Sequence, residues 1–200
     1  MTPELMNQLL WPFKALPDEY IVVDTETTGL FDAQGAPGIV SLGLALVQDK
    51  KIYASEEFLI QPHRPMNAEA SQINGITQEQ AQKHPAFSEQ WPKILPWLEK
   101  RLVVIHNASF DWPLIVDHIE RYKVVTPAIT GVFCSQRAAQ PWAQSVKIPC
   151  SARGPSLDNL TQYLKLDNQR DNQDGKHGAQ IDAIQTAEVV IQLQTPARKL

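Results

Sequence analysis

Short apolar runs mark the predicted strands of this chain. The run over residues 20–24 is continuous, which is typical of a central strand buried on both faces. Residues 39–47 and 51–60 predict two more strands, joined by the tight turn Gln48-Asp49-Lys50 into a hairpin. Further strands are predicted over 102–106 and 129–135. The chain therefore carries five candidate strands.

Stretches with helical spacing of apolar residues alternate with these strands. We predict a short helix over 4–15 ended by Pro17, helical turns over 66–83 broken at Asn74-Gly75, helices over 87–98, 107–122, 157–165 and 178–194, and a polar, proline-bearing loop over 141–155. On the last helix, the residues predicted to share one side are Ile181, Ile184, Ala187, Val190 and Ile191. A hairpin followed by alternating helices and strands predicts a three-layer α/β fold, with a mixed five-stranded sheet and helices on both faces.

The composition is that of a globular protein. Hydrophobic residues make up 43% of the 200 residues and charged residues 20%, which suits one domain with a sizeable core. The net charge of −4 argues against a broad basic surface, but not against nucleic acid bound at one local site. The apolar runs are too short to span a membrane, the N-terminus is not typical of a signal peptide, and the two cysteines are too few for a disulfide framework. We therefore expect a cytoplasmic protein.

Acidic residues follow the ends of predicted strands and open the last helix. Asp24 and Glu26 lie two residues apart at a strand end, so their side chains point to the same face. Asp111 follows another buried strand, and His177 and Asp182 lie at the start of the last helix. Carboxylates just past the carboxyl ends of strands lie where α/β folds place their sites, and their oxygens suit Mg²⁺ or Mn²⁺. Since neighbouring carboxylates repel, a positive species is expected between them.

Most of these residues, taken alone, have an ordinary structural explanation. Asp24 and Glu26 fit a solvated strand end. Asp111 fits an acid that interacts with a helix dipole, and His177 fits an ordinary histidine. Asp182 is harder to explain in this way, because it follows the apolar pattern of its helix closely. The conjunction of four acids and one histidine, in this order, favours a catalytic site.

The motifs DTETTG, HNASFD and HGAQID resemble the three exonuclease motifs of the DEDDh class of 3′–5′ exonucleases. Within that class the chain is similar to the proofreading exonuclease domain of epsilon subunits of bacterial DNA polymerase III, over about residues 20–194. The resemblance implies an RNase H-like fold, His177 as the general base, and two divalent metals, Mg²⁺ or Mn²⁺, held by the acids Asp24, Glu26, Asp111 and Asp182. It also implies two-metal hydrolysis that releases 5′-mononucleotides from DNA 3′ ends.

The same resemblance implies a set of substrate contacts. Thr27, Thr28 and Leu30 would meet the terminal nucleotide, with Leu30 wedged at the bases. Phe110 either stacks on a base or packs in the core. Asn74 stands where the epsilon-like pattern carries histidine, which affects a base or phosphate contact and not the metal chemistry. We expect a structural role for His106, at a strand end. We expect surface positions for the remaining histidines, His63, His84 and His118.

We divide the chain into an N-terminal extension over 1–19, an exonuclease domain over 20–194 and a short tail over 195–200. The extension either packs on the core or contacts a partner. The chain lacks the long tail by which an epsilon subunit joins its polymerase. We therefore expect a stand-alone exonuclease that acts on single-stranded or frayed 3′ ends, without a stable polymerase association.

The sequence leaves two other functions open. A 3′–5′ exoribonuclease similar to RNase T or oligoribonuclease would carry the same acids, and recognition of a 2′-hydroxyl leaves no short signature. The other alternative is a non-catalytic nucleic-acid-binding module. Loss of an acid or of the histidine would favour that module, and all five residues are present.

Overall fold

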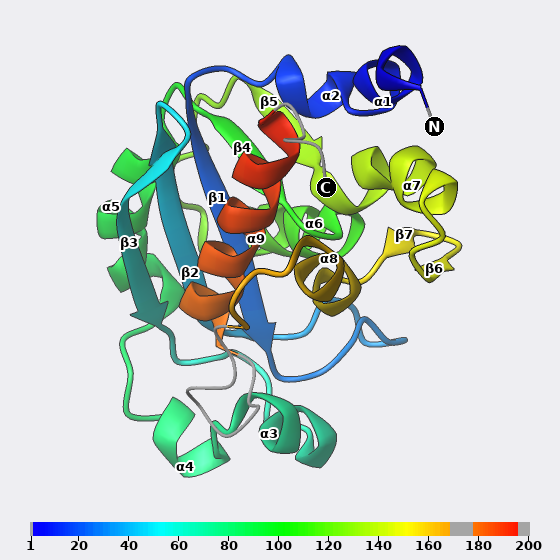
Figure 1. Cartoon of the computed structure of the whole chain (residues 1–200). Helices are drawn as coiled ribbons and strands as arrows, with labels where there is room; N and C mark the ends of the chain where they lie inside the picture. The colour runs from blue at the N-terminus through cyan, green and yellow to red at the C-terminus, as the bar shows by residue number, and fades with distance from the viewer. Residues whose placement is uncertain (1, 169–177, 196–200) are drawn as a thin grey trace.

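A mixed five-stranded sheet forms the centre of the structure (Figure 1). The computed structural model describes residues 2–168 and 178–195. The strands are β1 (Glu19–Thr27), β2 (Ile39–Gln48), β3 (Lys51–Leu59), β4 (Leu102–Ile105) and β5 (Gly131–Cys134). Their order is β3-β2-β1-β4-β5, in which β1 pairs antiparallel with β2 and parallel with β4. The predicted mixed sheet is therefore confirmed.

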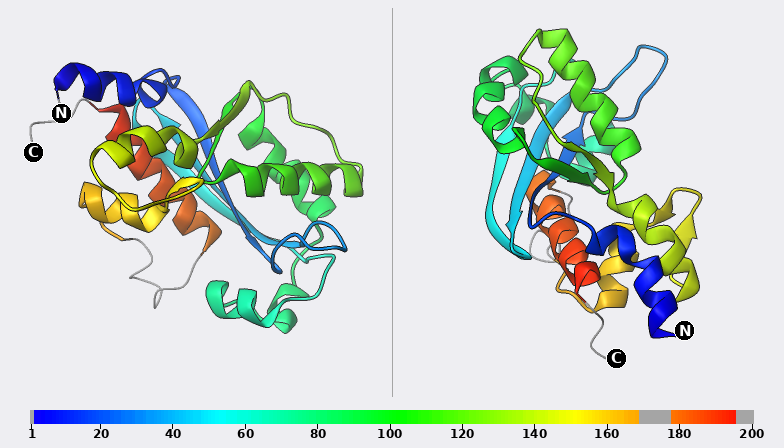
Figure 2. Two further views of the ribbon diagram at one scale, coloured as in Figure 1. Left: turned by 90° about the vertical axis from the view of Figure 1, so that its right-hand side faces the viewer. Right: turned by 90° about the horizontal axis from the view of Figure 1, so that it is seen from above.

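Helices connect the strands and cover both faces of the sheet (Figure 2). The helices are α1 (Pro3–Leu9), α2 (Trp11–Lys14), α3 (Ala68–Asn74), α4 (Gln78–Ala81), α5 (Phe87–Leu98), α6 (Ala108–Tyr122), α7 (Ser135–Ser145), α8 (Leu157–Leu164) and α9 (Ala179–Gln194). A small ribbon of β6 (Cys150–Ser151) and β7 (Gly154–Pro155) lies between α7 and α8. Within the described part of the chain, no helix combines the length and hydrophobicity needed to cross a bilayer.

The hairpin between β2 and β3 has the predicted turn. Asp49 and Lys50 have φ angles of 49° and 58°. This left-handed conformation at both central residues is what a two-residue type I′ turn requires. The turn brings Gln48 opposite Lys51. Strand β2 lies between β3 and β1, and nearly all of its side chains are buried.

Side chains that alternate along β1 enter two separate hydrophobic cores. Ile21 and Val23 pack on one face of the sheet, with residues of α5 and α6. Tyr20 and Val22 pack on the opposite face, with residues of α7, α8 and α9. The two views of Figure 2 show these helices on opposite sides of the sheet. The sheet is therefore the middle one of three layers, as the sequence predicts.

The first residues of the chain pack on the second of these cores. Leu10 and Phe13 are buried among residues of α7 and α9. The Phe13 ring meets Phe133 of β5 edge to face, with 5.4 Å between ring centroids. The indole Nε1 of Trp142 also lies 3.1 Å from the sulfur of Met6. Of the two roles considered for this segment, the structure thus shows packing on the core.

The predicted loop over 141–155 is wrong in its first part. Helix α7 continues through Pro141, and β6 and β7 form within the rest of that stretch. The polar, proline-bearing composition suggested a loop, because proline removes a backbone N–H and crowds the preceding turn. The helix nevertheless continues, since it buries Ala139, Trp142 and Ala143 in the core. That burial offsets the hydrogen bond lost at the proline.

The buried side of α9 also differs from the prediction. Of the residues predicted to share one side, Ala187 and Val190 are fully buried, whereas Ile181, Ile184 and Ile191 are only partly buried. Ala183, outside the predicted set, is fully buried as well. The helix crosses β1 and β2 and also contacts β3 and α8, so most of its circumference is covered. Small residues face the sheet because the helix lies close to it. Ile184 and Ile191 pack against the same core while partly buried.

The prediction that His118 lies at the surface is wrong. Its side chain is 1% exposed within α6, and its Nε2 accepts the backbone N–H of Ile39 at 3.1 Å. The Nδ1–H then donates to the carbonyl of Leu114 at 2.9 Å. The half-buried ring of His63 packs beside it, with 5.0 Å between centroids. Burial lowers the pKa of His118 to about 4.

We expect the contribution of His118 to the free energy of unfolding to fall as pH is lowered from 7 to 5. An unfolded histidine titrates at about 6.5. At this histidine the unfolded state therefore binds more protons than the folded state in this window. The stability that neutral His118 contributes above pH 6.5 is lost as pH falls toward its folded pKa. For His118 the loss at pH 5 is about 2 kcal/mol.

Urea unfolding of wild type, His118→Gln and the control His84→Gln at both pH values measures this effect. The control should keep the pH dependence of wild type. The change between the two pH values in His118→Gln should differ from that of wild type by about 2 kcal/mol, which is what His118 contributes. Equal pH dependence in wild type and His118→Gln would contradict the prediction.

Candidate active site

A cleft of about 550 Å³ opens where β1 ends. Asp24 and Glu26 line it from β1, Asp111 from α6 and Asp182 from α9. The four acids picked from the sequence thus meet in one place, although the helices that carry two of them lie on opposite faces of the sheet. His177 lies outside the described residues.

Three of the four carboxylates form a tight group. Asp24, Glu26 and Asp182 each offer an oxygen, and these oxygens all lie within 4.8 Å of one another. Glu26 and Asp182 are buried, and Asp24 is partly buried. Charges this close repel unless a cation lies between them, and carboxylate oxygens are the ligands that hard divalent ions prefer. The donor set therefore fits a divalent metal.

Backbone geometry at the end of β1 fits this grouping. Asp24 and Glu26 point to the face that α9 covers, because they alternate with Thr25 along the strand. The register of β1 against β2 shifts directly after Glu26, at a β-bulge or similar irregularity. Such irregularities re-aim side chains and occur often beside active sites.

Asp111 lines the same cleft from the opposite layer. Thr25 points toward α6, and its hydroxyl donates to the Asp111 carboxylate at 2.6 Å. Burial raises the pKa of Asp111 to about 7, while the hydrogen bond from Thr25 acts in the opposite direction. A cation in the cleft would favour the ionised form and bring this pKa down. Among the described residues, the tight group of carboxylates does not include Asp111.

The position of Asp182 depends on a close contact between α9 and the sheet. A Cβ added to Gly43 of β2 would lie 2.0 Å from the carbonyl carbon of Ala179, so a side chain there would push the start of the helix away. Gly43 is also the residue that pairs with Asp24 across β1 and β2. The contact therefore sets the height of Asp182 above the acids of β1.

The residues predicted to contact substrate fall into two groups. Thr27, Leu30, Phe110 and Asn74 line the cleft. Leu30 is 75% exposed there, as expected of a side chain available to a ligand. Thr28 is buried outside the lining, where its hydroxyl accepts the backbone N–H of Gly38 at 2.9 Å. The structure gives Thr28 a role in holding the following loop.

Asn74 joins two backbone segments beside the cleft. Its amide nitrogen donates to the carbonyl of Thr27 at 3.3 Å, and its amide oxygen accepts the N–H of Ile76 at 2.9 Å. Gly75, which follows, has the left-handed conformation that ends α3. Asn74 therefore holds the end of α3 against the end of β1.

Two exposed apolar residues of the cleft, Phe31 and Ile73, are not among the residues predicted from the motifs; they are 45% and 46% exposed. His106, expected to be structural, lines the cleft too, with its Nδ1 3.1 Å from the hydroxyl of Ser135. The one feature of the sequence that indicates Phe31 is its place as an aromatic residue in a loop rich in glycine, outside any helical or strand pattern.

A three-layer α/β fold with clustered carboxylates at the end of its central strand suits the class of metal-dependent enzymes. Comparison with known proteins agrees with that class. The profile of the RNase T family, described as exonuclease, matches residues 21–190. The chain belongs to this exonuclease family, and its motifs are those of the DEDDh class.

The chain is similar in sequence to named DNA polymerase III proteins. The DNA polymerase III subunit epsilon of Rickettsia prowazekii is 30% identical over 179 residues, which cover 86% of this chain and 72% of the relative. The PolC-type DNA polymerase III of Thermotoga petrophila is 30% identical over 184 residues, which cover 90% of this chain. The chain spans 12% of the length of that PolC-type relative.

Solved structures share the fold. Exonuclease X in complex with 5′ overhanging duplex DNA is 26% identical, with a TM-score of 0.61 over 87% of this chain and 90% of that one. E. coli exonuclease I in complex with a dT13 oligonucleotide has a TM-score of 0.72 over 90% of this chain and 41% of that one. Its identity of 16% makes it a likeness of fold alone.

Proposed function

We propose that this protein is a metal-dependent 3′–5′ exonuclease that releases 5′-mononucleotides from single-stranded or frayed DNA 3′ ends. The observation that carries the proposal is the set of oxygens from Asp24, Glu26 and Asp182 within 4.8 Å of one another. Asp111 lines the same cleft. Membership of the exonuclease family supports the reaction class. The names of the DNA polymerase III relatives and of the exonuclease X complex favour DNA over RNA.

In this proposal the acids hold two ions of Mg²⁺ or Mn²⁺. Asp24, Glu26 and Asp182 are the ligands already grouped, and Asp111 is the fourth acid of the cleft. When bound, such ions neutralise charge on the scissile phosphodiester and activate water for attack. Thr25 keeps the Asp111 carboxylate oriented into the cleft, and the contact at Gly43 keeps Asp182 over β1.

The general base is His177 in this proposal. The assignment rests on the resemblance of HGAQID to the third exonuclease motif, because His177 lies outside the described residues. A neutral imidazole accepts the proton of the attacking water, and a positioned base of this kind contributes about 10²–10⁴-fold to a rate.

The apolar part of the cleft binds the end of the strand. Leu30 and Phe110 offer apolar surface to bases, and stacking on an aromatic ring tolerates any base sequence. Thr27, which follows Glu26, lines the cleft too, and its hydroxyl donates to the carbonyl of Gly29 at 2.7 Å. The terminal nucleotide would therefore lie along this turn, with its phosphate toward the carboxylates.

We expect 5′-labelled single-stranded DNA to shorten as a ladder when Mg²⁺ or Mn²⁺ is present, and to stay intact with chelator. The ladder establishes the direction of attack, and chromatography of the released products identifies 5′-mononucleotides. RNA of the same sequence and a duplex with a mispaired 3′ end serve as parallel substrates. Faster degradation of RNA would favour the exoribonuclease alternative. Failure to shorten any substrate with either metal would support the non-catalytic alternative.

A further inference from the structure

The loop over 29–38, between β1 and β2, is closed at its base. Thr28 and Gly38 exchange two hydrogen bonds, since the N–H of Thr28 donates to the carbonyl of Gly38 and the Thr28 hydroxyl accepts the N–H of Gly38, both at 2.9 Å. Within the loop, Asp32 and Gly35 exchange backbone hydrogen bonds at 3.0 and 3.2 Å. The loop is therefore an ordered element of the cleft wall.

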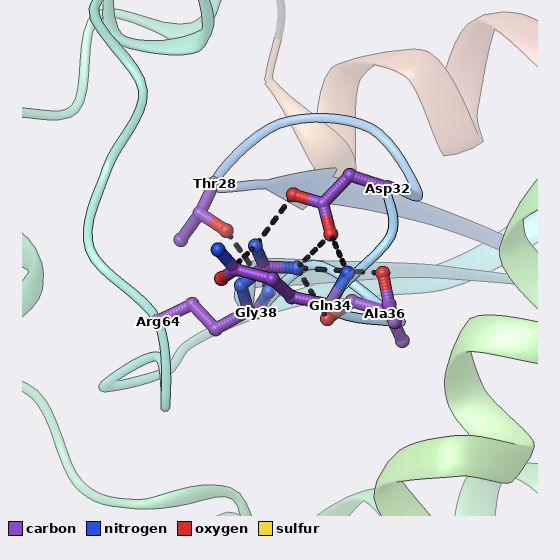
Figure 3. Close-up of polar contacts among 7 residues, drawn as sticks. Thr28, Asp32, Gln34, Ala36, Gly38 and Arg64 are labelled. Atoms are coloured by element: carbon purple, nitrogen blue, oxygen red, sulfur yellow. Dashed lines mark hydrogen bonds and ion pairs between the residues drawn. The ribbon is translucent and has the colours of Figure 1, made fainter.

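Arg64 lies outside this loop and donates hydrogen bonds to several of its residues. Figure 3 shows its guanidinium among the acceptors of the loop. Its Nη1 and Nη2 donate, over 2.6–3.3 Å, to both carboxylate oxygens of Asp32, to the side chain of Gln34, and to the carbonyls of Gly35 and Ala36. Arginine suits this task because its planar fork reaches several acceptors at once, whereas lysine is a single point charge.

The loop carries two exposed apolar side chains into the cleft. Leu30 is 75% exposed and Phe31 is 45% exposed, and both line the cleft. The Phe31 ring meets Phe110 edge to face, with centroids 5.6 Å apart and planes at 89°. Phe110 thereby supports Phe31 in a fixed orientation. A supported aromatic ring with nearly half of its surface exposed is suited to stack on a planar ligand.

The charge of the cleft favours contacts to bases over ion pairs with phosphates. Among the described lining residues six are acidic, and none is lysine or arginine. This part of the lining offers no ion pair to the phosphates of a strand. Beyond the reacting end, the apolar side chains of this wall can therefore add contacts to the bases.

We propose that Phe31 is a stacking platform for a nucleobase, and that Arg64 is the positioning residue that holds the loop carrying it. The proposal rests on the function proposed above and extends it by naming a residue that binds a base of the strand. A loop already ordered in the free protein loses less conformational entropy on binding, so the ring binds a base more tightly than a mobile ring would.

Stacking is tested with single-stranded hexanucleotides that carry 2-aminopurine at the terminal, second or third position from the 3′ end. Ca²⁺ replaces Mg²⁺ in this arm to suppress turnover. Wild type should quench the fluorescence at one position, and Phe31→Ala should remove that quenching. In the Mg²⁺ arm, Phe31→Ala should raise KM about tenfold with kcat nearly unchanged. Phe31→Tyr keeps the ring and should stay close to wild type.

The positioning role has its own variants. Arg64→Ala should change quenching and KM in the direction of Phe31→Ala, and Arg64→Lys should restore only part of the loss. Arg121→Ala is the matched control, because it removes an arginine paired with Asp117 at 3.2 Å on the surface of α6. The control should match wild type in both measurements. Thermal melting of each variant identifies any that fails to fold.

Wild-type quenching and KM in Phe31→Ala would overturn the stacking role. Wild-type behaviour of Arg64→Ala, or a fall in kcat without a change in KM, would overturn the positioning role. A wild type that turns over no substrate would overturn the proposed exonuclease instead, and the Ca²⁺ arm would still decide whether Phe31 binds a base.

Discussion

Replacing Asp182 with alanine should abolish Mn²⁺ binding at the cleft and lower the rate of hydrolysis by at least about 100-fold. Residues that merely support a metal ligand cost about 10–100-fold when changed, and the loss of a ligand itself should cost no less. Asp182 is 4% exposed, and its oxygen lies within 4.8 Å of those of Asp24 and Glu26. Removing its charge also relieves repulsion, so the melting temperature without metal should stay level or rise.

Calorimetric titration with Mn²⁺ and single-turnover kinetics measure the two losses in Asp182→Ala. Asp158→Ala is the matched control, because Asp158 is an exposed acid in the first turn of α8. The control should bind Mn²⁺ and degrade DNA as wild type does. Normal turnover in Asp182→Ala would end the proposed role for this residue.

Replacing His177 with alanine should separate the proton transfer from metal binding. We expect the rate to fall about 10²–10⁴-fold, the usual effect of losing a general base, while much of the Mn²⁺ affinity is kept. The wild-type rate should rise with pH through one ionisation, since only neutral imidazole accepts a proton, and the variant should lack that limb.

Single-turnover rates across a range of pH, beside Mn²⁺ calorimetry, test this prediction. His84→Ala controls for the loss of a histidine elsewhere in the chain. Two results would show that the base is misassigned: unchanged turnover in His177→Ala, or equal losses of metal binding and rate.

Local patterns predicted the parts of the site that lie on one element. The two-residue spacing of Asp24 and Glu26 on an apolar strand was enough to place both side chains on one face. It was not enough to place Asp182 beside them, because that depends on how closely α9 crosses the sheet. The signal for this crossing is Gly43, a lone glycine in a strand, which marks a close approach without saying what approaches.

The structure differs from the sequence-based expectation at His118 and in α7, where polar residue types or proline occur on or beside a buried helical face. As a polar residue His118 is expected at the surface, yet it follows Leu114 and Ile115 at helical spacing and continues their buried face. The buried residues of α7, Ala139, Trp142 and Ala143, also have helical spacing. Their pattern was hidden by the glutamines and the proline around them. In both cases the spacing of buried positions was a better guide than composition.

The distribution of the acids over three layers has a thermodynamic consequence. Asp24 and Glu26 belong to the sheet, Asp111 to a helix on one face and Asp182 to a helix on the other. Metal ions that share these acids as ligands would have high affinity only for the state in which both interfaces are closed. By mass action, such a ligand at a concentration 100 times its Kd stabilises the folded state by about 2.7 kcal/mol. Detachment of either helical layer would break the site, so the bound ions would couple the two cores into one cooperative unit.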